Sequence, residues 1–161
     1  MPRKNKKLPR HLLVIRTSAM GDVAMLPHAL RALKEAYPEV KVTVATKSLF
    51  HPFFEGLDVG FLDIETRRTH RGIRGAIRFA REAAELKIDA VADMHNVLRS
   101  KMVRAALHLR GIPVSVIHKG RIEKYMRLGR GSEGVKPLKH TVIRYCDVFR
   151  RLGFDFPDPR P

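Results

Sequence analysis

Polar and charged side chains gather in four segments of the sequence, each directly after a short apolar run: residues 17–22, 65–71, 95–99 and 118–121. Together they carry hydroxyl groups, carboxylates, histidines, several arginines and one lysine. These groups bind phosphates and sugars, and carboxylates and histidines also transfer protons. The four segments are therefore candidates for one site that binds an anionic or sugar ligand.

Asp22 is the candidate catalytic residue. It ends the segment Thr-Ser-Ala-Met-Gly-Asp at the point where a helix is expected to begin. One interpretation is an N-cap, a position that Asp fills well. The other is a general base that takes a proton from a substrate hydroxyl. A carboxylate at a helix N-terminus is favoured in its charged form and is a weak base, which suits a reaction in which a sugar departs before the proton moves.

The rest of segment 17–22 could bind an anion or a sugar through backbone N–H groups and the hydroxyls of Thr17 and Ser18. Gly21 is its only glycine and no lysine follows it, so the segment is neither a dinucleotide-binding fingerprint nor a Walker A loop. Thr17, Ser18 and Gly21 are therefore ligand-binding candidates.

Arg67, Arg68 and Arg71 make segment 65–71 a candidate phosphate-binding loop, because the planar guanidinium binds phosphate through two hydrogen bonds. The alternative is a solvated basic loop. The following helix continues the positive charge with further arginines at positions 74, 78 and 81, which favours the binding interpretation.

His95 and Asn96 are expected at the end of a strand, where both could donate hydrogen bonds to a polar ligand; Asn96 also suits a left-handed turn. A lone histidine is more often structural. Arg99, Lys119 and Arg121 belong to a basic stretch, residues 96–132, whose net charge is +8.

The hydrophobic pattern indicates the elements that must position these residues. Strands are expected over 11–17, 40–46, 59–64, 89–94 and 114–117, and helices over 23–37, 48–55, 73–86, 98–109 and from about 137 to 152. Pro27 is expected near the first turn of its helix. This alternation predicts a mainly parallel sheet covered on both faces, a Rossmann-like three-layer α/β/α domain. Ligands bind outside the carboxyl ends of such strands, so the four segments should converge on one edge.

Composition narrows the function classes. The 161 residues include 32 Lys and Arg against 16 Asp and Glu, a formal net charge of +16, which indicates an anionic partner: nucleic acid, a phosphorylated substrate or an anionic membrane surface. The apolar run 12–15 is too short for a signal peptide or a membrane span, so a cytoplasmic location is expected.

Other residues are assigned to the core. Cys146, the only cysteine, excludes an intrachain disulfide and is expected to be a small core residue rather than a nucleophile. The eight histidines form no H-x-x-x-H pair, and no metal is expected. Four aromatic residues are expected in the core: Phe50, Phe53, Tyr145 and Phe149.

Residues 11–37 consist of a predicted strand followed by two motifs, Arg-Thr-Ser-Ala-Met-Gly-Asp-Val and Met-Leu-Pro-His-Ala-Leu-Arg-Ala-Leu-Lys. This stretch closely resembles the opening of the heptosyltransferases of glycosyltransferase family 9. The resemblance continues through residues 89–100, Asp-Ala-Val-Ala-Asp-Met-His-Asn-Val-Leu-Arg-Ser, and 140–153. It departs at Asn96, where the family commonly has Gly, and at Ile143, where it commonly has Glu.

The resemblance implies one half of a GT-B fold, the two-domain arrangement of an inverting, metal-independent glycosyltransferase. Residues 1–10 would be a flexible basic arm, 11–155 the acceptor-binding domain and 156–161 the start of the interdomain linker. The donor, ADP-heptose, would bind a C-terminal domain that the chain lacks, and no other cofactor is implied. The family's proposed catalytic base falls on Asp22, and its basic acceptor-binding residues fall on the 67–71 loop and on Lys119 and Arg121.

The expected partners are a phosphorylated glycolipid acceptor of the lipopolysaccharide core, the donor domain and the anionic surface of the inner membrane, on which the chain would be peripheral. The chain alone is expected to be inactive, because donor binding and leaving-group stabilisation would lie elsewhere. The alternatives are a nucleic-acid-binding module and a non-catalytic membrane adaptor. Nucleic acid is less favoured, because the sequence has no Trp and only three Tyr for base stacking.

Overall fold

The computed structural model describes residues 7–65, 69–118 and 139–159. Within them, five parallel strands form one sheet in the order β3-β2-β1-β4-β5. The strands are β1 (His11–Ile15), β2 (Lys41–Thr46), β3 (Gly60–Asp63), β4 (Ala90–Asp93) and β5 (Val114–Val116). The expected parallel sheet is confirmed.

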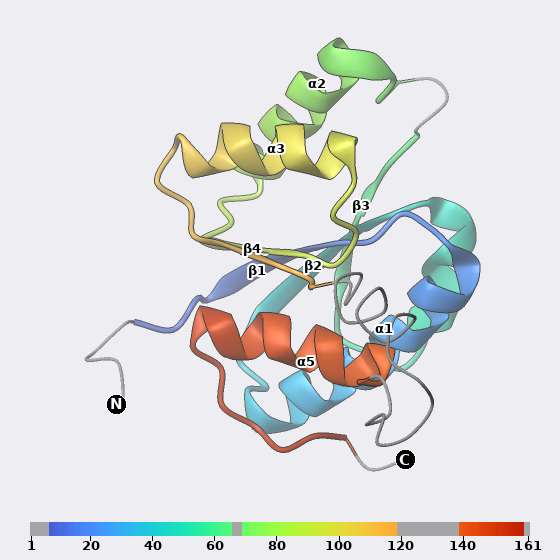
Figure 1. Cartoon of the computed structure of the whole chain (residues 1–161), viewed down its shortest axis with the longest axis vertical. Coiled ribbons are helices and arrows are strands. Elements are labelled where there is room, and N and C mark those ends of the chain that lie inside the picture. Colours follow the sequence, from blue (N-terminus) through green and yellow to red (C-terminus); the bar gives the residue numbers. More distant parts are fainter. Residues whose placement is uncertain (1–6, 66–68, 119–138, 160–161) are drawn as a thin grey trace, which may run out of the picture.

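Helices cover both faces of this sheet. On one face lie α1 (Met20–Ala36), α5 (Thr141–Leu152) and the short 3-10 helix η1 (Ser48–Phe54), and on the other lie α2 (Gly72–Glu85) and α3 (Leu98–His108) (Figure 1). The Rossmann-like three-layer α/β/α class is therefore confirmed.

Alternation along the strands creates two separate cores. In β1, Leu12 and Val14 join the core under α1 and α5, whereas Leu13 and Ile15 join the core under α2 and α3. All four are at most 2% exposed. Successive strand side chains point to opposite faces, so a strand that is apolar throughout is buried on both sides.

Helix α1 begins at Met20, earlier than the predicted start at residue 23, with Ala19 as its N-cap. Pro27 consequently lies well inside the helix, not near its first turn. A proline there removes one backbone hydrogen bond. The helix continues because Leu26, Leu30 and Leu33 are fully buried against the sheet.

Two further predictions were wrong in detail. Helix α5 begins at Thr141, not near residue 137, and His140 is its N-cap, accepting the Val142 N–H through its side chain. Phe53 is 38% exposed, because Phe50 and Phe54 are the residues of η1 that face the core. Phe50, Tyr145 and Phe149 are buried as expected.

The ends of the described chain contact the domain. Leu8 packs against the core, and the Arg10 N–H donates to the Asp89 carboxylate at 2.9 Å. At the other end, the Asp155 N–H donates to the Tyr37 hydroxyl at 2.9 Å. None of the described helices is both long enough and apolar enough to cross a membrane.

Candidate functional site

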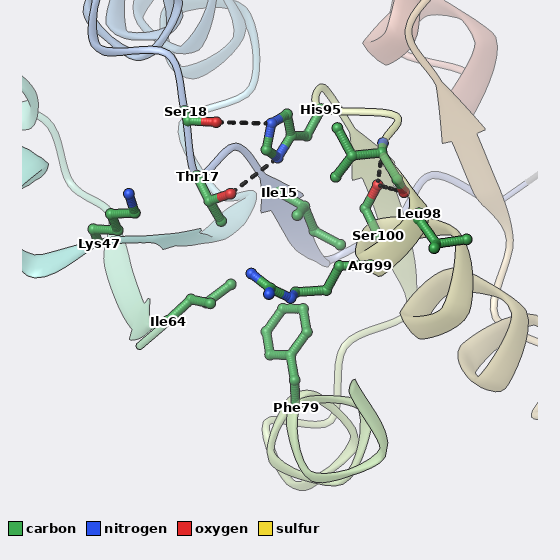
Figure 2. A pocket seen from close by; sticks show the side chains of 11 residues that line it. Ile15, Thr17, Ser18, Lys47, Ile64, Phe79, His95, Leu98, Arg99 and Ser100 are labelled. Atoms are coloured by element: carbon green, nitrogen blue, oxygen red, sulfur yellow. Dashed lines mark hydrogen bonds between the residues drawn. The ribbon is translucent and has the colours of Figure 1, made fainter. Parts of the chain in front are cut away.

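The strand order reverses between β1 and β4, and the loops after these two strands meet there. In open parallel sheets, the crevice outside the carboxyl ends at such a point is the usual place for a ligand. Thr17 and Ser18 follow β1 and His95 follows β4. The Thr17 Oγ1 lies 2.9 Å from His95 Nδ1, and the Ser18 Oγ lies 3.0 Å from His95 Nε2 (Figure 2). The sequence prediction that these segments converge is confirmed for this pair.

Asp93 holds the turn that presents His95. Its side chain is fully buried, and its Oδ1 accepts the backbone N–H groups of His95 at 2.9 Å and Asn96 at 2.8 Å. Its Oδ2 accepts from Arg104 Nη1 at 3.0 Å, so the buried charge is paired. Asn96 adopts the left-handed conformation at φ 47°, as its residue type indicated.

A pocket of about 300 Å³ opens beside these hydrogen bonds, on the side of the sheet covered by α2 and α3. Its polar lining comes from the segments that follow β1, β2 and β4 and from the start of α3: Thr17, Ser18, Lys47, His95, Arg99 and Ser100. Figure 2 shows the Arg99 guanidinium reaching from the start of α3 toward the Phe79 ring, with Lys47 on the far side of the pocket.

The pocket combines positive charge with an apolar floor of Ile15, Ile64 and Phe79. Lys47 and Arg99 can bind an anionic group, and the hydroxyls of Thr17, Ser18 and Ser100 can hydrogen-bond a polyol or phosphate oxygens. An apolar surface beneath polar groups also suits the C–H face of a sugar ring. The lining therefore fits a small phosphorylated or acidic sugar.

Asp22 lies at the same sheet edge but does not line this pocket. It is the third residue of α1, not its N-cap, and its carboxylate makes no capping hydrogen bond. Its Oδ2 instead accepts from Arg16, whose side chain is 7% exposed and also donates to the Met94 carbonyl. A buried guanidinium requires such partners, so Arg16 draws the carboxylate toward β1.

The Asp22 side chain remains 44% exposed. Within the described part of the chain, its Oδ1 accepts no hydrogen bond, and a substrate hydroxyl could reach it. The N-cap interpretation is therefore wrong, whereas the position is compatible with a general base. The first helical turn also favours a negative charge.

Tyr145 of α5 supports the start of α1 from behind. Its hydroxyl donates to the Asp22 carbonyl oxygen at 2.9 Å, and its ring is fully buried. Burial raises the pKa of Tyr145 to about 12, although the nearby Arg16 charge opposes this rise. The hydroxyl therefore stays protonated and continues to donate throughout the physiological pH range.

The loop before α2 is anchored by His70, whose side chain is buried and does not face solvent. Its Nδ1 accepts the Glu65 N–H at 3.2 Å, so its Nε2 carries the proton and donates to Glu82 at 2.9 Å. Burial raises the pKa of Glu82, but hydrogen bonds from Arg78 and His70 outweigh it and lower the pKa overall. Gly75 lets this loop pack closely against α2, because a Cβ at position 75 would lie 2.1 Å from the His70 backbone.

Of the candidates, Thr17, Ser18, His95 and Arg99 come together in the pocket. Asn96 is next to it and contacts Arg104, Gly21 is exposed in the first turn of α1, and Arg71 is the exposed N-cap of α2. The remaining four lie outside the described residues: Arg67, Arg68, Lys119 and Arg121.

Three useful residues were missed by the sequence interpretation: Lys47, Arg16 and Asp93. Lys47 follows β2. The four candidate segments follow the other strands, so the residues after β2 were not considered. Arg16 directly after a four-residue apolar run signals a buried cation that needs a carboxylate. Cys146 is buried, which confirms it as a core residue, and burial raises its pKa to about 11, which disfavours the thiolate form.

Within residues 7–65, 69–118 and 139–159, no three side chains of His, Cys, Asp or Glu are grouped so that they could hold a metal ion. The functional groups of the edge are thus the hydroxyls, cations and carboxylate described above.

No protein-family model matches the sequence, and no curated protein matches it. Solved structures do match. A glycosyltransferase family 9 protein from Veillonella parvula aligns at a TM-score of 0.65 and 17% identity, over 89% of this chain and 42% of that one. The E. coli heptosyltransferase WaaC, solved with ADP-2-deoxy-2-fluoro heptose, aligns at 0.63 and 23%, over 93% and 50%.

A UDP-N-acetylglucosamine 2-epimerase also aligns, at a TM-score of 0.51 and 18% identity, over 71% of this chain and 33% of that one. The chain thus spans half or less of the length of each of these enzymes. At identities below 25%, the likeness shows the fold and not the activity. The chain has the Rossmann-like fold of one part of nucleotide-sugar enzymes, with heptosyltransferases of glycosyltransferase family 9 among its similar structures.

Proposed function

We propose that the chain is the acceptor-binding half of an inverting, heptosyltransferase-like glycosyltransferase. With a donor-binding half supplied, it would take part in moving heptose from ADP-heptose to a phosphorylated acceptor of the lipopolysaccharide core. The likeness to solved heptosyltransferases supports this class, as do the sequence motifs around Asp22 and His95. The chain would work in the cytoplasm, at the inner surface of the membrane that carries the acceptor.

The observation that carries the proposal is the junction of the β1 and β4 loops. Thr17 and Ser18 bind His95 there, and a cationic pocket and an exposed carboxylate lie on either side of the junction. A binding module would need the pocket alone. The exposed carboxylate of Asp22 adds a group that could take the proton of a hydroxyl bound there, once the two come within hydrogen-bond distance.

In the proposed reaction, Asp22 takes the proton of an acceptor hydroxyl as its oxygen forms a bond to the anomeric carbon of the donor. The bond from that carbon to the diphosphate breaks, and the diphosphate leaves with the electron pair on the opposite face, which inverts the configuration. Arg16 holds the carboxylate in place. Leaving-group stabilisation would come from the donor half, so the chain alone transfers no sugar.

In the proposed complex, Lys47 and Arg99 bind the acceptor's phosphate or acidic groups from opposite sides of the pocket. Arg67, Arg68, Arg71, Lys119 and Arg121 remain proposed acceptor-binding residues on neighbouring loops. The hydroxyls of Thr17 and Ser18 and the imidazole of His95 would orient the sugar ring between the phosphate and the base.

Calorimetric titration of the chain with water-soluble phosphorylated core oligosaccharide tests this proposal. Arg99→Ala and Lys47→Ala are each expected to weaken binding about tenfold or more, because each removes a charge-assisted hydrogen bond. Arg31→Ala, an exposed arginine on α1 across the sheet, is the control and should bind as the parent does. Equal binding of the dephosphorylated oligosaccharide, or tighter and steeply salt-dependent binding of RNA, would contradict the assignment.

A further inference from the structure

Helix α2 exposes isoleucines on the surface of the α2 and α3 layer. Ile73 is 67% exposed and Ile77 is 48% exposed. They are four residues apart, so they lie next to each other on one side of the helix. The opposite side, with Ala76, Phe79 and Ala83, is buried against the sheet. The isoleucines therefore form an apolar stripe that no described segment covers.

Arginines border this stripe. Arg71, Arg74, Arg78 and Arg81 are all exposed, and the sequence from 71 to 81 contains no Asp or Glu. Arg78 pairs with Glu82, whereas Arg71, Arg74 and Arg81 form no ion pair with an acidic residue of the described chain. An exposed helix with isoleucine flanked by arginine has the pattern of helices that lie in the interface of an anionic bilayer.

The layer formed by α2 and α3 also carries apolar side chains that line the pocket. Leu98, the first residue of α3, is 76% exposed and lines the pocket together with Phe79 of α2. Helices α2 and α3 lie next to each other on this face of the sheet (Figure 1). The apolar and cationic surface of α2 therefore belongs to the layer that forms one wall of the pocket.

We propose that this surface, defined by Ile73, Ile77, Arg74 and Arg81, docks the chain on an anionic lipid bilayer. The isoleucines enter the boundary between headgroups and acyl chains, and the arginines bind lipid phosphates. This inference deepens the proposed function, since it names the face that brings the pocket to a membrane-borne acceptor.

The chemistry of the surface favours a bilayer over the other occupants. A nucleic-acid surface uses aromatic side chains for stacking, and the exposed side of α2 from 73 to 81 has none. The core of a protein interface is depleted in charge, whereas Arg74 and Arg81 lie directly beside these isoleucines on the exposed side of α2. A bilayer satisfies both groups at once, since it presents apolar and anionic layers at successive depths.

Co-sedimentation of the full 161-residue chain with vesicles tests the inference. Vesicles of 30 mol% phosphatidylglycerol in phosphatidylcholine, a composition of roughly physiological anionic charge, contain no glycolipid. We expect binding to these vesicles and little binding to pure phosphatidylcholine. Ile73→Ser is expected to weaken partitioning into the vesicles about tenfold, because it removes one aliphatic side chain that would be buried in the bilayer. Arg74→Glu is expected to weaken it about tenfold or more.

Matched controls exist on the other side of the sheet. Leu49→Ser removes an apolar side chain that is 65% exposed on η1, and Arg31→Glu reverses an exposed charge on α1; both should bind vesicles as the parent does. Asp22→Asn should also bind normally, so a failed catalytic role leaves this test unaffected. Absence of vesicle binding by the parent, or equal losses in the variants and their controls, would overturn the inference.

Discussion

The two faces of the sheet are built differently. Among the described residues, the face under α1 and α5 contributes 24 buried residues to its core, whereas the face under α2 and α3 contributes 12. The larger core contains Tyr145, Phe149 and Phe154, each at most 1% exposed. In the smaller core, most of the residues that α2 contributes are alanines, and the pocket opens beside them. The outer surface of α2 exposes isoleucines. We call this side of the sheet the thinner face.

The candidate chemistry is divided in the same way. Asp22 is tied to the well-packed face through Arg16 and the Tyr145 hydroxyl. The cationic pocket belongs to the thinner face. A base needs a fixed position, which dense packing provides, whereas a binding pocket and a docking surface need space and exposed groups. His95, bound to Thr17 and Ser18, connects the two regions.

The largest expected stability difference between the faces concerns their phenylalanines. Phe149→Ala is expected to lower the free energy of unfolding by about 3–5 kcal/mol, because the ring is fully buried and leaves a cavity. Phe79→Ala is expected to cost less, although this ring is only 1% exposed, because it borders the pocket and packs in the smaller of the two cores. Urea denaturation followed by circular dichroism measures both. An equal or larger loss for Phe79→Ala would refute the contrast in packing.

Gly75 offers a sharper test of the thinner face. A Cβ at this position would lie 2.1 Å from a His70 backbone atom, so Gly75→Ala must push the loop away from α2, and we expect a loss of about 1–3 kcal/mol. Gly21→Ala in α1 meets nothing within 4 Å and is the matched control, expected to be neutral or stabilising by at most about 1 kcal/mol. Thermal unfolding of both variants decides the point, and similar melting temperatures would contradict it.

The well-packed face should also lose stability in alkali. The pKa of Tyr145 rises from 10.0 to about 12 on folding, so its contribution is complete below pH 10 and is lost as the pH rises toward 12. We expect a loss of about 1–3 kcal/mol across this window. Tyr145→Phe should be less stable near neutral pH but show a flatter alkaline profile, measured by urea midpoints. An unchanged profile would place the alkaline sensitivity elsewhere.

The sequence predicted the layers well because the relevant signals are local. Buried strands such as residues 11–15 are apolar without interruption, and Gly153 marks the end of α5 with a φ of 111°. The start of α1 was misplaced because residues 20–22 have no capping side chain before them, and Asp22 is drawn away by Arg16. That pairing depends on burial, which a sequence pattern does not specify.

The candidate site was predictable in its position but not in its membership. Parallel strands bring their following loops to one edge, which correctly placed Thr17, Ser18 and His95 together. Which side of the sheet each group faces depends on the packing, so Asp22 and the pocket fell on different sides. Lys47 follows from the same topological rule applied to β2, whereas the buried Asp93 and Arg104 pair required the folded chain.

The central claim is that Asp22 performs proton transfer while the pocket binds the acceptor. Initial rates of heptose transfer from ADP-heptose to phosphorylated core acceptor, with the donor-binding half supplied, test it most directly. Asp22→Asn is expected to lower kcat by about 10²–10⁴-fold with acceptor affinity unchanged, whereas Arg99→Ala is expected mainly to raise the acceptor KM. A near-normal kcat for Asp22→Asn would contradict the account.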